Sequence, residues 1–305
     1  MIDKNEIRII LPRHGFFYKY IETSGYAVSD PYYGRSVILR ALRTIHFKLQ
    51  LPFRYIWFNR KNICTKRIII LYEPLITSDY IKWLHKYNPN SKLMLIYANS
   101  VKTSISPKSI NRSVVELWTL DKDDAIKYGM HLYNGGGYFR QWKITKRKPI
   151  YDVFYIGKDK NRLQKLRAIE RDLQANGLKT MFYITWERGW QHKNDGIHKP
   201  FLPYESVLNY MGESKAILHL LDGAQHGITL RIQESLIHKI KLITDDKDLV
   251  KYDFYNPNNI FILGKDNLKD IRHFLDTPYE DVQSDFFQHA FYDQMISEVI
   301  DGSIK

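Results

Sequence analysis

The chain has 305 residues, enough for two compact domains, and its hydrophobic fraction of 44% excludes a chain that is disordered throughout. No run approaches the roughly 20 apolar residues that a membrane-spanning helix needs. The first residues lack the apolar stretch of a signal peptide, and the lone Cys64 cannot form an internal disulfide. We therefore expect a cytoplasmic protein.

Charge is divided unevenly along the chain. Residues 1–150 hold 26 Lys and Arg against 10 Asp and Glu, a net charge of +16, and residues 151–305 hold 20 against 23, a net charge of −3. Together they give the +13 of the whole chain. A basic half of this kind favours an anionic partner, which nucleic acid, an anionic membrane surface or a phosphorylated glycolipid would each provide.

The first half alternates strands with helices. We expect strands at Ile7–Leu11, Tyr55–Phe58, Arg67–Tyr72, Lys92–Tyr97 and Val115–Leu120, and helices at Ser36–Leu49, Ser78–Lys86 and Asp123–Tyr128. Continuous apolar runs such as residues 68–71 are typical of parallel strands buried on both faces. The helix at 36–49 is amphipathic, with one apolar stripe formed by Ile38, Leu42, Ile45 and Leu49.

Glycines at 135–137, followed by the basic stretch 143–148 and Pro149, indicate a domain boundary. The predicted domains are therefore residues 1–148 and 149–305. The second series has expected strands at Tyr151–Ile156, Thr180–Thr185, Ala216–Leu221, Lys241–Thr244 and Asn259–Leu263, and helices at Lys160–Asn176, Tyr204–Met211 and Gly227–His238. A last helix at about 280–300 is expected to pack back on the first domain.

This alternation predicts right-handed βαβ units and a parallel sheet in each half. The predicted fold class is α/β, with two Rossmann-like domains that face each other across a cleft. Ligands of such sheets bind at the carboxyl ends of the strands, so strand ends are where candidate residues are sought.

One candidate phosphate site follows the strand at 151–156. Gly157 permits a close backbone approach, Lys158 and Arg162 supply positive charge, and the helix that follows offers free N–H groups. An ordinary turn with solvated basic residues would have the same sequence. The dinucleotide pattern Gly-x-Gly-x-x-Gly is absent from the sequence.

A second candidate site begins after the strand at 216–221. A loop containing Gln225 and Gly227 leads into a helix, and Arg231 and Glu234 are three residues apart on its surface. Arginine can hold phosphate, and a carboxylate can accept both hydrogen bonds of a ribose diol. The alternative is an intrahelical ion pair on a solvated face, but the position beside a glycine-containing loop favours a binding site.

The run SKAILHLLDGAQHGITLRIQESLIHKIKLITDD, with the later YDFYNPNNIFIL, resembles the donor-binding half of bacterial GT-B glycosyltransferases of lipopolysaccharide and capsule biosynthesis. YDVFYIGKDKNRLQKL is similar to the start of that family's second domain, and ELWTLDKDDAIKYG to the end of its first. The resemblance covers most of residues 67–264. It implies a transferase that uses a nucleotide sugar, with UDP as the favoured nucleotide and a surface glycan or glycolipid as acceptor.

The resemblance also implies roles for individual residues. Glu234 matches the carboxylate that grips the donor ribose, and Tyr204 lies where the nucleobase is usually held. The remaining donor contacts that it implies are Gly157, Lys158, Arg162, Gln225, Gly227, Ile228, Thr229 and Arg231. A second glutamate, common in the family, is missing, because Lys241 and Leu242 occupy that region.

The chemistry requires stabilisation of a departing diphosphate, and GT-B enzymes generally use basic residues and helix N-termini for this in place of a metal. An inverting enzyme also needs a general base. The candidates, chosen for their positions at strand ends and in loops, are His14, Asp30 and Glu73. No metal or other cofactor is expected.

A rival metal pattern is Asp121-x-Asp123, of the kind that binds a divalent cation and phosphates in single-domain transferases. Its position before a helix favours N-terminal capping by Asp121 instead. His192 and His198 lack the spacing of a zinc site.

Basic residues are interleaved with aromatic residues between residues 35 and 67, which favours docking on the inner face of the cytoplasmic membrane. The alternative is that Tyr55–Phe58 form a core strand, so that the aromatic side chains are internal and only the charges are exposed. No nucleic-acid motif accompanies these charges, so nucleic acid is the less favoured partner. Two alternatives to a transferase stay open. One is a basic nucleic-acid-binding or scaffold protein, and the other is a sugar-nucleotide epimerase or hydrolase of the same architecture.

Overall fold

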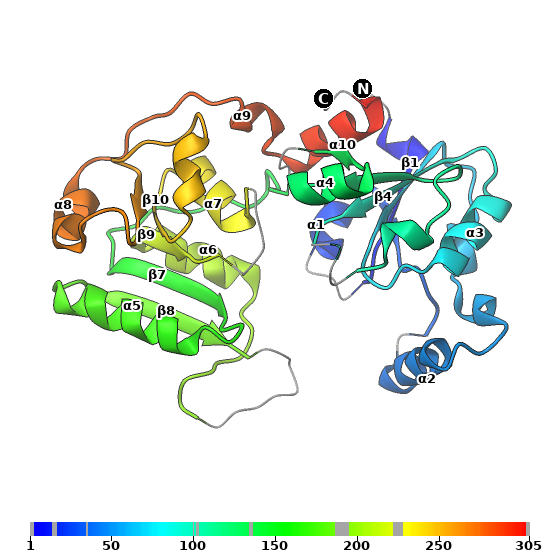
Figure 1. The fold of residues 1–305 in the computed structure, drawn as a ribbon, viewed down its shortest axis with the longest axis horizontal. Coiled ribbons are helices and arrows are strands. Elements are labelled where there is room, and N and C mark those ends of the chain that lie inside the picture. The colour runs from blue at the N-terminus through cyan, green and yellow to red at the C-terminus, as the bar shows by residue number, and fades with distance from the viewer. Residues whose placement is uncertain are drawn as a thin grey trace. The chain divides into compact units, whose positions relative to one another are not determined.

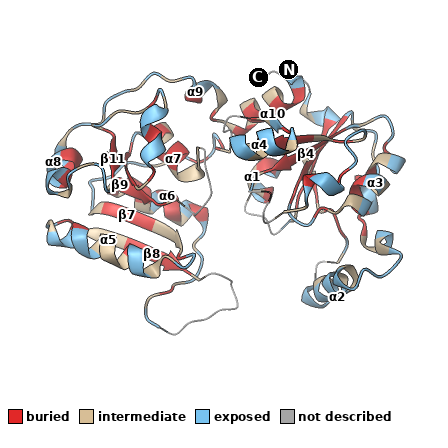
Figure 2. Ribbon diagram, in the orientation of Figure 1, coloured by how far each residue is buried: buried red, intermediate tan, exposed pale blue. Residues whose placement is uncertain are grey.

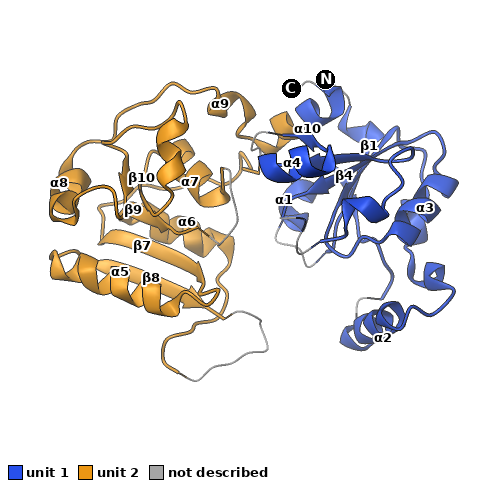
Figure 3. Ribbon diagram, in the orientation of Figure 1, with its two compact units in different colours: residues 1–134, 296–305 blue, residues 135–295 orange. Residues whose placement is uncertain are grey.

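The computed structural model describes residues 3–13, 17–34, 36–99, 101, 104–133, 137–186, 195–221 and 228–302. The chain divides into two compact units (Figure 3). Unit 1 is Met1–Asn134 with Ile296–Lys305, and unit 2 is Gly135–Met295. Each unit contains one parallel β-sheet (Figure 1), so the predicted α/β class with a parallel sheet in each half is confirmed.

Unit 1 is built on a six-stranded sheet in the order β2-β1-β3-β4-β5-β6. Ile9, Ile70 and Leu95 in its central strands are completely buried, as the apolar runs predict. The strands are β1 (Ile7–Ile10), β2 (Ala27–Ser29), β3 (Ile68–Tyr72), β4 (Lys92–Tyr97), β5 (Glu116–Thr119) and β6 (His131–Leu132). The helices are α1 (Tyr18–Thr23), α2 (Val37–Lys48), α3 (Ser78–Tyr87) and α4 (Lys122–Tyr128).

Unit 2 is built on a five-stranded sheet in the order β11-β10-β9-β7-β8. Its core includes Val153, Leu166 and Ile243, all fully buried. The strands are β7 (Tyr151–Lys158), β8 (Thr180–Thr185), β9 (Ser214–His219), β10 (Lys241–Thr244) and β11 (Ile260–Ile262). The helices are α5 (Leu163–Ala175), α6 (Tyr204–Gly212), α7 (Leu230–His238), α8 (Ile271–Asp276) and α9 (Phe286–His289). Helix α10 (Tyr292–Asp301) contains the change from unit 2 to unit 1.

The first unit ends at Asn134, which is earlier in the chain than the domain boundary predicted between residues 148 and 149. The segment between the two positions is held by unit 2. The ring of Trp142 lies 4.3 Å from the ring of Tyr204, and the N–H of Arg147 donates to the carbonyl of Gly212 at 3.0 Å.

The strand predicted at Tyr55–Phe58 is wrong. Residues Arg54–Trp57 form a 3-10 turn (η2), which begins after Phe53 adopts a left-handed conformation with φ of 62°. Phe58 forms only an isolated antiparallel bridge with Tyr32, because β3 already pairs with β1 and β4 on its two sides. The short strands β2 and β6 and helix α1 were not predicted, since each is too brief to carry a periodic pattern.

Three predicted helices are too long. Helix α5 begins at Leu163 because Lys160 and Asn161 have positive φ angles, and α7 begins at Leu230. In the tail, residues 280–285 are not helical, since Glu280 is held by hydrogen bonds with Asn259 in both directions. Helix α5 ends at Ala175, one residue before the predicted end at Asn176, and Gly177 follows with φ of 75° and donates its N–H to the carbonyl of Gln174 at 2.8 Å.

Candidate functional site

The candidate donor site lies at the carboxyl ends of β7 and β9 in unit 2. Because neighbouring parallel strands end at the same edge of the sheet, Lys158 at the end of β7 and His219 at the end of β9 share that edge. Helix α7 is tied to it, because Nη2 of Arg231 donates to the carbonyl of Ile156 at 3.4 Å. The first turn of α7 and the end of β7 therefore form one local structure.

Glu234 is completely buried on α7, where Oε1 accepts a hydrogen bond and Oε2 forms an ion pair but has no hydrogen-bond partner among the described residues. The Tyr204 hydroxyl donates to Oε1 at 2.5 Å, and Nη1 of Arg231 lies 2.5 Å from Oε2. Burial raises the pKa of Glu234, against the opposing effects of the Arg231 charge and the Tyr204 hydrogen bond. The structure thus joins three predicted donor residues, with Tyr204 contacting the carboxylate directly.

The start of α7 is supported by a buried histidine. Nε2 of His219 lies 3.2 Å from the hydroxyl of Thr229, the residue before α7, and Nδ1 lies 3.0 Å from the hydroxyl of Thr244 in β10. Burial lowers the pKa of His219 to about 4, so the ring is neutral at pH 7. Among the described residues, Thr229 precedes the first turn of α7 and makes no side-chain capping hydrogen bond to it. Ile228, predicted as a donor contact, lies next to this turn and accepts from Gln233 at 3.2 Å.

The predicted basic loop after β7 is used partly for internal contacts. Nη1 of Arg162 donates to the carbonyls of Leu220 and Leu221 at 2.9 and 2.6 Å, so its guanidinium joins the start of α5 to the end of β9. Nζ of Lys158 lies 5.7 Å from the centre of the Phe201 ring. At Gly157, a Cβ atom would lie 3.0 Å from the Tyr155 hydroxyl, which explains a small residue there.

Sequence reasoning missed a carboxylate–histidine–carboxylate cluster beside this loop. His198 is buried, with Nε2 at 2.6 Å from Asp159 and Nδ1 at 2.6 Å from Asp195. Burial by itself lowers the pKa of His198, but its hydrogen bonds to the two carboxylates, with their charges, outweigh burial and raise the pKa above its ordinary value. The cluster fixes residues 195–198 to the end of β7. Asp195 and His198 are three residues apart, but Asp159 is 39 residues from His198, so no local spacing could have revealed the whole cluster.

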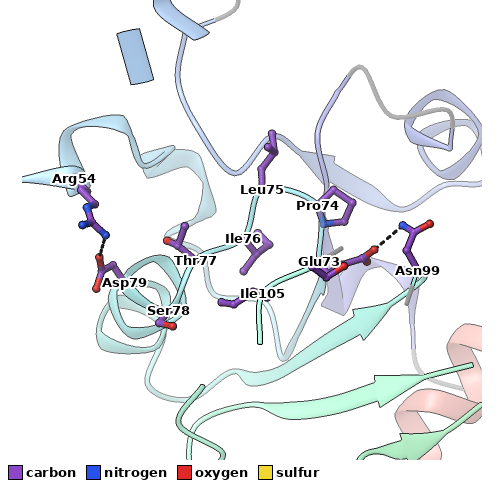
Figure 4. Close-up of a pocket in the computed structure, with 11 residues that line it drawn as sticks. Arg54, Glu73, Pro74, Leu75, Ile76, Thr77, Ser78, Asp79, Asn99 and Ile105 are labelled. Carbon is purple, nitrogen blue, oxygen red and sulfur yellow. Dashed lines mark hydrogen bonds and ion pairs between the residues drawn. The ribbon is translucent and has the colours of Figure 1, made fainter. Parts of the chain in front are cut away.

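Unit 1 has a separate pocket of about 670 Å³ at the carboxyl ends of β3 and β4 (Figure 4). The Glu73 carboxylate lines it, accepting hydrogen bonds from the Asn99 side chain at 2.6 Å and from the N–H of Ala98 at 3.1 Å. Burial raises the pKa of Glu73, although these hydrogen bonds oppose the rise. Leu75, also in the lining, has a φ of 69°, an unusual backbone conformation next to a candidate base.

The other sequence candidates are less informative. Oδ1 of Asp30 accepts from the N–H of Arg13 at 2.5 Å, so it stabilises the turn after β1. His14, Gln225 and Gly227 lie outside the described residues. Asp121 caps α4, accepting from the N–H of Asp124 at 3.0 Å, which confirms the capping interpretation. Over the described parts of the chain, no group of three or more His, Cys, Asp or Glu side chains is placed to hold a metal ion.

No protein-family model and no curated protein matches this sequence. Among solved structures, the apo form of the lipopolysaccharide outer core galactosyltransferase WaaB aligns with a TM-score of 0.43 and 12% identity over 97% of this chain and 99% of that chain. T4 phage BGT in complex with its UDP-glucose substrate aligns with a TM-score of 0.49 and 14% identity over 97% of this chain and 94% of that chain. At these scores the alignments do not decide function, which has to be argued from the site.

His219 should make stability depend on pH. Its pKa is about 4 in the folded protein, against about 6.5 in an unfolded chain. Between these values the unfolded chain binds a proton that the folded protein does not, so the contribution is complete above pH 6.5 and is lost as the pH falls toward 4. We expect the melting temperature of the native protein to fall more between pH 7.5 and 5 than that of His219→Asn. An equal fall in both proteins would contradict this assignment.

Proposed function

We propose that this chain is a glycosyltransferase that moves a sugar from a UDP-linked donor to a surface glycan or glycolipid, without a metal. The observation that carries the proposal is the arrangement at the start of α7. Arg231 contacts both Glu234 and the end of β7, beside a helix N-terminus that the Thr229 side chain does not cap. These are the positions at which the resemblance to GT-B glycosyltransferases implies donor binding.

The donor diphosphate would bind at the first turn of α7. Helix N-termini attract anions through their N–H groups and dipole, and Arg231 adds a cation three residues from Glu234. Lys158 supplies a second charge from the end of β7. When the sugar–phosphate bond breaks, negative charge builds on the departing diphosphate, and cations fixed in advance stabilise it there.

The donor ribose is assigned to Glu234. Tyr204 donates to Oε1 and Arg231 forms an ion pair with Oε2, so a ribose hydroxyl that binds at Oε1 would replace the Tyr204 hydroxyl. The exchange keeps the buried carboxylate hydrogen-bonded throughout, which is required when a charge lies in a site without water.

The acceptor is assigned to unit 1, where Glu73 would serve as general base. Its raised pKa brings a carboxylate closer to the proton affinity that removal of a hydroxyl proton requires. The pocket lining adds hydroxyl and amide groups able to bind a sugar, from Thr77, Ser78 and Asn99.

A thermal-shift screen of nucleoside diphosphates, with EDTA present, tests the donor site. A ligand that binds only the folded protein raises its free energy of unfolding by RT ln(1 + [L]/Kd), and the melting temperature rises with it. We expect UDP to stabilise the native protein with EDTA present and to have at least tenfold lower affinity for Arg231→Gln.

Arg272→Gln is the matched control, because Arg272 is another arginine of unit 2 whose guanidinium binds a backbone carbonyl, that of Gly177. Its response to UDP should equal that of the native protein. Stabilisation that requires a divalent cation would contradict the metal-independent mechanism. The absence of any nucleotide response from folded protein would overturn the donor site.

A further inference from the structure

Helix α2 in unit 1 has its apolar face in solvent. Ile38, Leu42, Ile45 and Leu49 form the apolar stripe, and their exposed fractions are 73%, 50%, 52% and 64%. No residue of α2 is buried, and Figure 2 shows the helix as exposed along most of its length. An aliphatic stripe of this kind normally covers a core, so its exposure marks an interaction surface.

The opposite face of α2 packs on the rest of the unit. The ring of Phe47 lies 5.4 Å from Tyr32, the Arg43 guanidinium lies 4.6 Å above the same Tyr32 ring, and Nε2 of His46 lies 2.8 Å from the carbonyl of Pro52. Serine capping fixes the start of the helix, since Ser36 accepts from the N–H of Leu39 at 3.2 Å. The helix is therefore held on its polar and aromatic side, with the aliphatic side turned outward.

The apolar surface continues into the segment after α2. Leu51, Phe53, Tyr55 and Ile56 have exposed fractions of 43%, 64%, 54% and 57%. Leu51 and Phe53 precede η2 (Arg54–Trp57), the 3-10 element that contacts α2, and Tyr55 and Ile56 lie within it. We call this surface the α2 patch, consisting of Val37, Ile38, Leu42, Ile45, Leu49, Leu51, Phe53, Tyr55 and Ile56.

Charge around the α2 patch is mainly positive; the carboxylate of Asp79, which lines the same pocket as Leu51, Phe53 and Tyr55, pairs with Arg54 at 2.8 Å. Residues 31–72 contain nine Lys and Arg and no Asp or Glu. Lys48 at the end of α2 is exposed, as are Arg60 and Lys61 just beyond the patch. Exposed aliphatic and aromatic side chains bordered by cations are typical of helices that lie in the interface of an anionic bilayer.

We infer that the α2 patch docks this protein on an anionic lipid bilayer. The aliphatic side chains enter the boundary between headgroups and acyl chains, and the surrounding cations bind lipid phosphates. Helix α2 has 12 residues and a length of about 18 Å, which is too short to cross the hydrocarbon core of a bilayer. It therefore lies in the interface. Within the described part of the chain, no helix is both long and apolar enough to cross a membrane.

The other possible occupants fit less well. A second copy of the chain would bring together two surfaces rich in cations and without carboxylates in residues 31–72, which repel each other. Nucleic acid would satisfy the cations, but its phosphates gain nothing from exposed leucine and isoleucine side chains. Only an anionic bilayer offers both phosphates for the cations and an apolar layer for the aliphatic side chains.

Vesicle co-sedimentation with the full chain tests the inference. We expect binding to vesicles with 30% phosphatidylglycerol in phosphatidylcholine, and at least tenfold weaker binding to phosphatidylcholine alone. The triple variant Ile38→Ser, Leu42→Ser, Ile45→Ser should lose at least tenfold in affinity for the anionic vesicles. Its control is Ile126→Ser on α4, a residue that is 84% exposed outside the patch and should change nothing.

Several outcomes would overturn the inference. These are no binding to anionic vesicles, an equal loss in Ile126→Ser, or a dimer in analytical ultracentrifugation that the triple variant dissociates. Retained vesicle binding by the triple variant, together with displacement by an oligonucleotide, would show a purely electrostatic surface and would also overturn it. The substituted side chains lie far from the donor site in sequence and in a different unit, so UDP stabilisation of the triple variant tests the proposed function separately.

Discussion

Glu234→Ala is expected to abolish UDP binding and to lower the free energy of unfolding by about 3 kcal/mol. The substitution leaves Arg231, which is only 19% exposed, without its carboxylate partner, and it removes the acceptor of the Tyr204 hydroxyl. Removing one partner of a buried ion pair lowers the free energy of unfolding by about this amount, because the remaining charge is uncompensated. The loss of binding follows because the proposed ribose acceptor and the partner of Arg231 disappear together.

Isothermal titration with UDP, well below the melting temperature of the variant, separates the two effects. Glu234→Gln is the matched comparison, since it keeps an oxygen for the Tyr204 hydroxyl and removes the charge that pairs with Arg231. We expect intermediate stability and at least tenfold weaker UDP binding. If Glu234→Ala melts early yet binds UDP with unchanged affinity, the residue is structural and the donor site lies elsewhere.

Gly212→Ala is expected to destabilise the protein by about 2 kcal/mol, against the preference of helices for alanine. Gly212 is the last residue of α6, and an added Cβ would lie 2.4 Å from the carbonyl oxygen of Thr145 and 3.0 Å from Cγ2 of Ile144. Backbone cannot yield as a flexible side chain does, so the segment around Thr145 must shift away from α6. The hydrogen bond from the N–H of Arg147 to the Gly212 carbonyl would weaken with it.

Urea unfolding at 25 °C measures this effect. The matched control is Gly137→Ala, where the nearest atoms to a new Cβ are those of the Gln233 side chain at 3.9 Å. We expect that control to change the free energy of unfolding by less than about 0.5 kcal/mol. Equal stability of Gly212→Ala and the native protein would mean that residues 144–145 are not packed against α6.

The helix α2 shows where prediction from a pattern stops. Its boundaries are close to those predicted, because Ser36 supplies a side-chain cap and the apolar residues recur with the period of a helix. The same period cannot tell which way the stripe faces. That was decided by Tyr32, Pro52 and η2, which receive the side of α2 that carries Arg43, His46 and Phe47.

The aromatic run at Tyr55–Phe58 was predicted as a strand and forms none. Its composition favours a strand, but a strand needs a free edge of a neighbour with which to pair. Strand β3 is paired on both sides, and the left-handed Phe53 turns the chain just before the run. The residues have a composition typical of a strand, but β3 offers no free edge with which they could pair.

At the site, the sequence by itself determined the two parallel α/β units, the strand ends at which ligands of such folds bind, and the helical spacing that puts Arg231 beside Glu234. These follow from local periodicity, which is written in neighbouring residues. Only the tertiary structure decided that Tyr204 binds Glu234, that His219 supports Thr229, and that Asp159, His198 and Asp195 form one cluster. Contacts between residues distant in the chain depend on how strands and helices pack, and one sequence carries no local signal for them.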